Sequence, residues 1–205
     1  MDAVTSVQQT FALWDEPASD HRSRIVADGA DRVAWLRARA QGVTATDAAR
    51  LSSMRAVQTV ALEKLLGTGF GGNAFTEHGI AREPEIARWV LAEHGISPNS
   101  ALFHAHGEKR HLATPDGVAS IGGVLCLSEI KTTSHRWRSI PRSYLRQVWW
   151  QQYVLGAERT LFAWEHHVDF RPTDAEPRTQ WIDRDDNEIH ILVAYAEKLL
   201  DAMRR

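Results

Sequence analysis

The sequence predicts a mixed α/β fold in which a central sheet is flanked by helices. Short apolar runs separated by turn residues occupy the middle of the chain, between residues 101 and 131, and such runs are typical of strands. The segments on either side carry apolar residues at helical spacing. A chain of 205 residues with 43% hydrophobic content is long enough to bury one core of ordinary size. One compact domain is therefore expected.

The N-terminal segment differs from the rest of the chain. Residues 1–28 carry Pro17 and several small polar residues without clear periodicity, so we expect an irregular arm followed by a single domain over residues 29–205. Helical spacing begins at Asp31. A second, short helix is expected to begin near Thr44, whose hydroxyl can cap the first turn.

Two longer helices follow. The first is predicted over residues 52–66 and ends at Gly67, because the run GTGFGGN supplies glycines that stop helices. No phosphate-loop lysine follows these glycines, so the run is interpreted as a flexible connection. The second helix, over residues 77–94, contains Pro84, which predicts a start near Arg82 or a kink.

Glu83 is the first candidate site residue. It falls within the apolar stripe of the second helix, at about 100° per residue. The apolar members of this stripe are Ile80, Ile86, Ala87, Val90 and Leu91. An unpaired carboxylate on an inward face is costly to bury, so a metal ion, an arginine or a lysine is expected to meet Glu83.

The predicted sheet begins with runs at 101–106, 110–113 and 123–131. Strand alternation in VLCLSEIK places Glu129 and Lys131 on one face and Ile130 on the other. The remaining elements are a helix over 141–155, strands over 160–168 and 179–183, and a terminal helix over 187–203.

Composition excludes several classes of protein. Cys126 is the only cysteine, so one chain cannot form an internal disulfide or a four-cysteine zinc site. No stretch approaches the roughly 20 apolar residues of a membrane helix, and no secretory signal is visible. We therefore expect a soluble cytoplasmic protein without membrane contact. A net charge of −2 argues against coating nucleic acid through bulk charge.

Three charged residues form the main chemical motif. Asp116 follows a turn, and Glu129 and Lys131 come thirteen and fifteen residues later, across a probable hairpin through Ile121, Gly122 and Gly123. Carboxylate oxygens bind Mg²⁺, with Mn²⁺ as a substitute, and an ammonium group can hold the attacking water or neutralise a phosphate. The motif predicts metal-dependent cleavage of phosphodiester bonds. An isolated Glu-x-Lys triplet would be weak evidence, but the strand, the Pro-Asp-Gly turn and Glu83 strengthen it.

Basic and aromatic residues alternate in RWRSIPRSYLR at 136–146. The arginines are Arg136, Arg138, Arg142 and Arg146, and the aromatic residues are Trp137 and Tyr144. This mixture suits phosphate contact and base stacking. A solvated loop and helix start is the equally weighted alternative.

The histidines suggest a less favoured metal site. His104, His106 and His111 have a spacing that could suit Zn²⁺, although exposed strand histidines are commoner than ligands. His166 and His167 alternate along their strand, so at most one of them is expected to face the core.

Several of these segments resemble one nuclease family. TPDGV at 114–118, SEIKT at 128–132, GIARE at 79–83, YLRQVWWQQYVLG at 144–156 and WLRARAQGVTATDAA at 35–49 are similar to the PD-(D/E)XK nucleases, in the branch of lambda exonuclease and the YqaJ-like viral recombinases. The resemblance covers most of the chain. It implies a restriction-endonuclease-like core and a bacterial or phage-infected host cell.

The resemblance also implies roles for single residues. Asp116, Glu129 and the carbonyl of Ile130 resemble the metal ligands, and Glu83 the helical carboxylate that completes the site. Lys131 resembles the catalytic lysine, and Gln147 the glutamine at the edge of the active site. Arg39, Thr46 and Thr114 resemble a pocket for a terminal 5′-phosphate, where relatives usually carry serine at both threonine positions. The segment TTSH at 132–135 replaces the Cys-Pro of many relatives.

The expected function is a Mg²⁺-dependent exonuclease that digests linear duplex DNA from a free 5′ end and leaves 3′ single strands for recombination. Relatives pair with a single-strand annealing protein and form ring-shaped trimers, so both are expected partners. The alternatives are an endonuclease of restriction or junction-cleaving type and a catalytically silent DNA-binding module.

Overall fold

The computed structural model describes residues 20–68 and 74–204, and its core is a mixed sheet with the order β10-β8-β7-β6-β3. The paired strands β7 and β8 are parallel, and the other pairs are antiparallel. A short strand, β9, pairs with β8 off this path. The bounds are β3 Ser97–Pro98, β6 Gly117–Ile121, β7 Val124–Thr133, β8 Arg159–Val168, β9 Arg171–Pro172 and β10 Arg178–Asp183.

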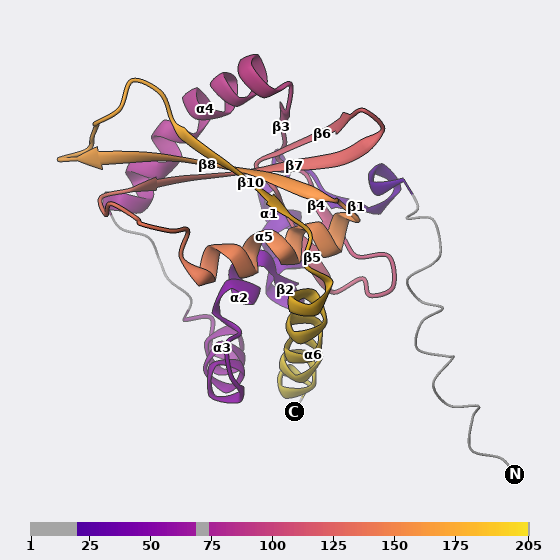
Figure 1. Cartoon of the computed structure of the whole chain (residues 1–205). Helices are drawn as coiled ribbons and strands as arrows, with labels where there is room; N and C mark the ends of the chain where they lie inside the picture. Colours follow the sequence, from indigo (N-terminus) through magenta and orange to yellow (C-terminus); the bar gives the residue numbers. More distant parts are fainter. Residues whose placement is uncertain (1–19, 69–73, 205) are drawn as a thin grey trace, which may run out of the picture.

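A second, smaller sheet has the order β1-β4-β5-β2. Its strands are β1 Ile25–Ala27, β2 Val43–Thr44, β4 Leu102–His104 and β5 His111–Ala113. The predicted fold class is confirmed, since helices cover both faces of the large sheet (Figure 1). Strands β4 and β5 correspond to the predicted runs at 101–106 and 110–113, which were expected in the central sheet rather than in a separate one. Strands β1 and β2 were not predicted, because strands of two or three residues are too short to show alternation.

The helices lie on both sides of the large sheet (Figure 1). They are η1 His21–Arg24, α1 Arg32–Gln41, α2 Ala45–Arg50, α3 Met54–Leu66, α4 Ala74–His94, α5 Arg142–Leu155 and α6 Asp186–Met203. Helix α4 covers one face of the large sheet, and α5 lies against the other (Figure 1). None of the helices in the described part of the chain combines the length and the hydropathy needed to cross a bilayer.

Helix α5 lies between the two sheets. Val148, Trp150 and Val154 are fully buried and belong to the largest core cluster. The indole Nε1 of Trp150 donates to the carbonyl of Leu112 in the small sheet at 3.0 Å. The helix ends at Gly156, whose φ of 75° lies in the left-handed region that favours glycine. Burial on both sides fixes the position of α5 against the large sheet.

Most predicted helix boundaries are confirmed. The side chain of Thr44 accepts a hydrogen bond from the amide of Asp47, as expected for the first residue of a capped short helix. Helix α3 ends at Gly67, where φ is 64°. The glycines at 71 and 72 lie outside the described residues.

The N-terminal prediction was wrong for residues 21–27. They form η1 and β1, and β1 pairs with β4. The guanidinium of Arg24 is buried, and it donates to the carbonyls of Val154, of Leu155 at 3.0 Å and of His104 at 2.8 Å. A single buried arginine produces no periodic pattern, so the attachment could not be seen in the sequence. Residues 1–19 lie outside the described part.

The predicted start of α4 near Arg82 was also wrong. The helix begins at Ala74, and Pro84 lies inside it. Pro84 deprives the Ile80 carbonyl of its helical donor, but both residues are exposed, so water can supply the missing bond. Ile80 and Leu91, expected in the apolar stripe, are 65% and 43% exposed. Only the centre of the stripe, including Ile86 and Val90, packs on the sheet.

The prediction for the two adjacent histidines of β8 was wrong as well. His166 and His167 are both buried, at 7% and 2% exposure. His166 Nδ1 lies 2.8 Å from the hydroxyl of Thr173, and the ring of His167 stacks on Phe170. Alternation still places the two side chains on opposite faces, but both faces of the strand are covered here.

Candidate active site

The hairpin of β6 and β7 positions Asp116. Gly122 and Gly123 make its turn with φ values of 60° and 83°. Asp116 precedes β6, and its amide donates to the carbonyl of Ser128 at 3.0 Å. Its carboxylate Oδ2 accepts from the amide of Ile130 at 2.6 Å. Two backbone contacts therefore hold Asp116 beside the strand residues Glu129 and Ile130.

Glu129 is the most enclosed charged group of the site. Its side chain is 1% exposed, and its Oε1 accepts hydrogen bonds from Lys131 Nζ and Gln147 Nε2. Its Oε2 accepts from Gln151 Nε2 at 2.6 Å. The predicted residues Glu129, Lys131 and Gln147 are thus brought together by β7 and α5.

Gln151 was not predicted from the sequence. It lies four residues after Gln147, so one helix face presents both amides to the same carboxylate. The signal that could have found it is this spacing. The side chain of Gln151 is fully buried, and its Oε1 atom has no hydrogen-bond partner in the described residues.

Glu83 interacts electrostatically with Lys131 and Glu129. Glu83 is exposed rather than inward as predicted, although its neighbours Ile86 and Ala87 in the same part of α4 are buried against the sheet. Partial burial nevertheless raises the pKa of Glu83; the positive charge of Lys131 opposes this shift, and the negative charge of Glu129 adds to it. Arg82, the residue before Glu83, attaches α4 to strand β8. It donates to both carboxylate oxygens of the buried Glu165, at 3.0 and 2.6 Å.

The site carries excess negative charge. Burial raises the pKa of Asp116 well above its usual range, and the charge of Glu129 raises it further, against the attraction of Lys131. Burial by itself would lower the pKa of Lys131, but Glu129 and Asp116 outweigh that effect and leave it raised. Lys131 is therefore a persistent ammonium ion between acidic groups.

The donor set suits a hard divalent cation. Asp116 and Glu129 offer carboxylate oxygens, and their mutual repulsion is the kind that Mg²⁺ relieves. Within residues 20–68 and 74–204, no three His, Cys, Asp or Glu side chains form a ready-made metal cluster. The oxygens of Glu129 accept hydrogen bonds from Lys131, Gln147 and Gln151.

The predicted phosphate residues are only partly brought together. Arg39 and Thr46 line a hollow of about 380 Å³ between α1, α2 and α3. The ion pairs Lys64–Asp47 and Arg50–Glu63 also line it. The guanidinium of Arg39 lies 4.2 Å from the ring centroid of Trp35. Burial lowers the pKa of Arg39. Thr114 does not line this hollow, but its Oγ1 is buried without a hydrogen-bond partner in the described residues.

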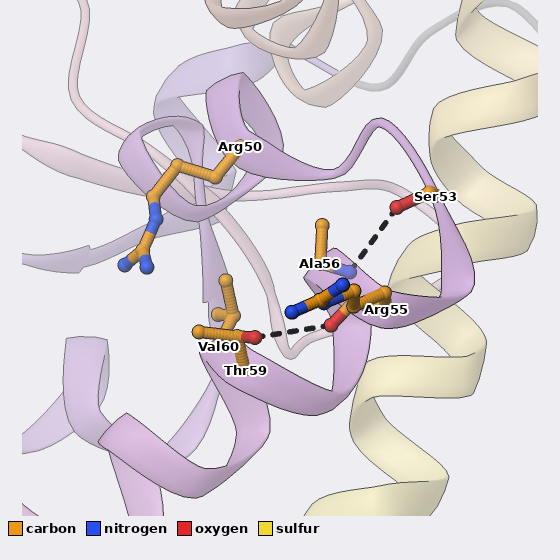
Figure 2. Close-up of a pocket in the computed structure, with 6 residues that line it drawn as sticks. All are labelled: Arg50, Ser53, Arg55, Ala56, Thr59 and Val60. Atoms are coloured by element: carbon orange, nitrogen blue, oxygen red, sulfur yellow. Dashed lines mark hydrogen bonds between the residues drawn. The ribbon is translucent and has the colours of Figure 1, made fainter.

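A neighbouring hollow of about 310 Å³ contains none of the predicted site residues (Figure 2). It lies at the start of α3, where Ser53 Oγ accepts from the amide of Ala56 at 3.2 Å. Its lining is Arg50, Ser53, Arg55, Ala56, Thr59 and Val60. It is distinct from the centre at Glu129.

The four predicted DNA-contacting arginines have different surroundings. Arg136 and Arg138 are exposed on the loop between β7 and α5. Arg142 forms an ion pair with Glu188 and lies 4.8 Å from the ring centroid of Trp149. Arg146 Nε donates to the carbonyl of Ala49 at 2.9 Å. Arg136 and Arg138 are thus the members best placed for an external phosphate.

The structure does not support a zinc site at the three histidines. His111 is 1% exposed, its Nδ1 lies 3.0 Å from the hydroxyl of Tyr153, and burial lowers its pKa to about 4. His104 Nδ1 lies 2.7 Å from the carbonyl of Ala105. His111 is a core residue.

Comparisons with known proteins bear on the family and the fold of the chain. A family model described as the YqaJ-like viral recombinase domain matches residues 34–158. No curated protein matches the sequence.

Several solved structures share the fold. An alkaline exonuclease from Laribacter hongkongensis, LHK-Exo, is 22% identical with a TM-score of 0.67, over 83% of this chain and 91% of that chain. A phage-related exonuclease from Haemophilus somnus 129PT is 14% identical with a TM-score of 0.57, over 73% and 79% of the two chains. A protein titled SSO0001 is 13% identical with a TM-score of 0.53, over 78% and 76%.

Proposed function

The chain belongs to the YqaJ-like viral recombinase domain family, and from that premise we propose that it is a Mg²⁺-dependent DNA exonuclease. It digests linear duplex DNA from a 5′ end and leaves 3′ single-stranded overhangs for phage-type recombination. The observation that carries this proposal is the contact of Lys131 with the buried Glu129, beside Asp116. The printed names of two proteins with the same fold, an alkaline exonuclease and a phage-related exonuclease, support it.

Asp116, Glu129 and the carbonyl of Ile130 would hold the cation, with Glu83 completing the set from α4. Mn²⁺ is a chemically acceptable substitute. When bound, the cation polarises the phosphate and lowers the pKa of a coordinated water. The excess negative charge around Asp116 supports this assignment, because an added positive charge would relieve it.

Lys131 supplies a positive charge that is already fixed in position before the substrate binds. Its ammonium group is held by Glu129, so it can orient the attacking water or neutralise the phosphate without reorganisation. Gln147 and Gln151 keep the Glu129 carboxylate in one orientation. These three side chains position groups around the scissile phosphate.

The 5′-end preference rests on the hollow at Arg39. A guanidinium fork binds phosphate with two hydrogen bonds, and Thr46 adds a hydroxyl at the same hollow. Thr114 does not line this hollow, so its part in binding the phosphate rests on the resemblance alone. Arg136 and Arg138 would contact the DNA backbone outside the site.

One experiment separates the candidate activities. The protein is incubated with Mg²⁺ and either end-labelled linear duplex or covalently closed circular DNA. Loss of linear DNA alone, faster with a 5′-phosphate, is the expected result. Cutting of the circle would instead indicate an endonuclease. Binding without cleavage of either DNA, unchanged in Glu129→Ala, would indicate a silent DNA-binding module.

Two partners belong to the same proposal. A ring-shaped homotrimer would enclose the duplex, and a single-strand annealing protein would take up the 3′ strand. Sedimentation of the purified chain, with and without linear duplex, tests the trimer. Co-migration with an annealing protein supplied in trans tests the second partner.

A further inference from the structure

Three half-buried aromatic side chains lie together beside Lys131. They are Trp137, Tyr144 and Trp164, which come from the β7–α5 loop, α5 and β8, and together they form what we call the aromatic platform. The ring centroid of Trp137 lies 5.3 Å from that of Tyr144 and 6.3 Å from that of Trp164. The proposed reaction does not use these rings.

The platform rests on the core without being part of its interior. Phe162 is fully buried and lies under it, with its ring centroid 6.0 Å from Tyr144 and 5.9 Å from Trp164. The ring pairs within the platform are tilted, at 33° and 48°, rather than stacked. Since its members are only half-buried, each of them keeps part of its side-chain surface exposed to solvent.

The platform adjoins the reacting groups. Trp164 in β8 is the register partner of Lys131 in β7. The ammonium of Lys131 lies 5.5 Å from the ring centroid of Tyr144 while it contacts Glu129. A phosphate held at Lys131 would therefore place its attached nucleoside within reach of these rings.

The loop that carries Trp137 is basic, whereas acidic groups lie on the other side of Lys131. Residues 130–157 contain no aspartate or glutamate, whereas they contain Lys131 and four arginines. Of these arginines, Arg136 and Arg138 flank Trp137 in sequence and are exposed. Aromatic rings interleaved with free cations bind nucleic-acid strands through stacking and phosphate contacts together.

We propose that the aromatic platform stacks on one nucleobase next to the phosphate that Lys131 binds. This inference rests on the proposed function and adds to it the way in which the strand is held. Every nucleobase has a π face, so the contact is indifferent to base identity. It would hold the strand in register between cleavage steps.

The test uses equilibrium binding, with Ca²⁺ in place of Mg²⁺ to suppress cleavage. The DNA is a labelled linear duplex with a single abasic site at one of the first nucleotides of the 5′ strand. The proteins are wild type, Trp137→Leu and Trp137→Phe. Trp181→Leu is the matched control, because Trp181 on β10 is also half-buried but packs against the core cluster that contains Ile86 and Val90, not against the platform.

An abasic site at one position should weaken wild-type binding about tenfold, which corresponds to about 1.4 kcal/mol. Trp137→Leu should weaken binding of intact DNA by a similar factor. The affinity of this variant should be the same for intact DNA and for DNA with that abasic site. Trp137→Phe should retain most of the affinity, and Trp181→Leu should behave as wild type.

The proposal is overturned if Trp137→Leu responds to every abasic site as wild type does. Thermal melting identifies a Trp137→Leu protein that does not fold, in which case Tyr144→Leu is measured by the same comparison. Binding is measured without cleavage, so the two proposals can fail separately. If loss of the Trp137 ring and loss of the base have the same, non-additive effect but the protein never hydrolyses DNA, the nuclease proposal is refuted and the stacking proposal is retained. If the protein hydrolyses DNA but the two losses act independently, the stacking proposal is refuted and the nuclease proposal is retained.

Discussion

Lys131 is the residue on which the proposed chemistry depends most. We expect Lys131→Ala to lower turnover by orders of magnitude, because the fixed positive charge at the phosphate is lost. Glu129 keeps two amide donors, from Gln147 and Gln151, so the fold should remain. Single-turnover cleavage of linear duplex measures the effect, with the exposed Lys198→Ala as control. Wild-type rates in Lys131→Ala would refute the assigned role.

His111 gives the core a pH dependence that is separate from catalysis. Burial lowers its pKa from 6.5 to about 4, so between these values the unfolded chain binds a proton that the folded chain does not. The free energy of unfolding should therefore fall as the pH is lowered through this range, by up to about 3 kcal/mol.

The variant His111→Gln isolates this contribution, because its amide can still reach the hydroxyl of Tyr153. Urea unfolding is measured at about pH 7 and about pH 5. The loss of stability between these conditions should be smaller in His111→Gln than in wild type. An equal loss in both proteins would assign the acid sensitivity to other groups.

At the level of elements, the N-terminal segment is tied to α5 by one side chain. Arg24→Met should lower the free energy of unfolding by about 3 kcal/mol or more, because three carbonyls, two of them in buried hydrogen bonds, lose a charged donor. Arg22→Met is the matched control, since Arg22 is exposed in the same 3-10 helix. Urea unfolding of the two variants measures the difference, and equal stability would contradict the structural role of Arg24.

Sequence patterns predicted the elements that have enough length to show a period. Strand β7 could be assigned, with Glu129 and Lys131 on one face and Ile130 on the other. Thr44, Gly67 and Gly156 marked helix ends, because each has a local chemical cause. Strands β2, β3 and β9 have two residues each, so no alternation exists to be recognised.

The part of the candidate site that lies on one local element was predictable from the sequence. Asp116, Glu129 and Lys131 lie on one hairpin, so their approach follows from strand register alone. Glu83, Arg39 and Thr114 belong to other elements, and their distances depend on how those elements pack. The burial of Arg24 and the exposure of Ile80 are likewise set by tertiary contacts.

For the whole molecule, we expect the acidic centre to lower the free energy of unfolding when no metal is bound. The folded chain raises the pKa of Asp116 above its unfolded value, so ionisation at neutral pH opposes folding. Without divalent metal, Asp116→Asn should therefore melt at a higher temperature than wild type. With Mg²⁺ at 100 times its dissociation constant, wild type should gain about 2.7 kcal/mol, and the variant should gain much less.

Thermal melting in EDTA and in Mg²⁺ measures both effects. Asp201→Asn is the control, because Asp201 is an exposed residue of α6. It should show the same Mg²⁺ response as wild type. Identical responses of wild type and Asp116→Asn to Mg²⁺ would remove Asp116 from the set of metal ligands.

The enclosure of α5 between two sheets also has a kinetic consequence. Its central amide hydrogens can reach solvent only when both sheets separate from it, so they should exchange with deuterium as slowly as global unfolding permits. The first turn, which follows Pro141 without a side-chain cap, should exchange faster. Gln147 and Gln151 lie beyond that turn. Local opening of the first turn of α5 would therefore leave the hydrogen bonds from the Gln147 and Gln151 side chains to Glu129 intact.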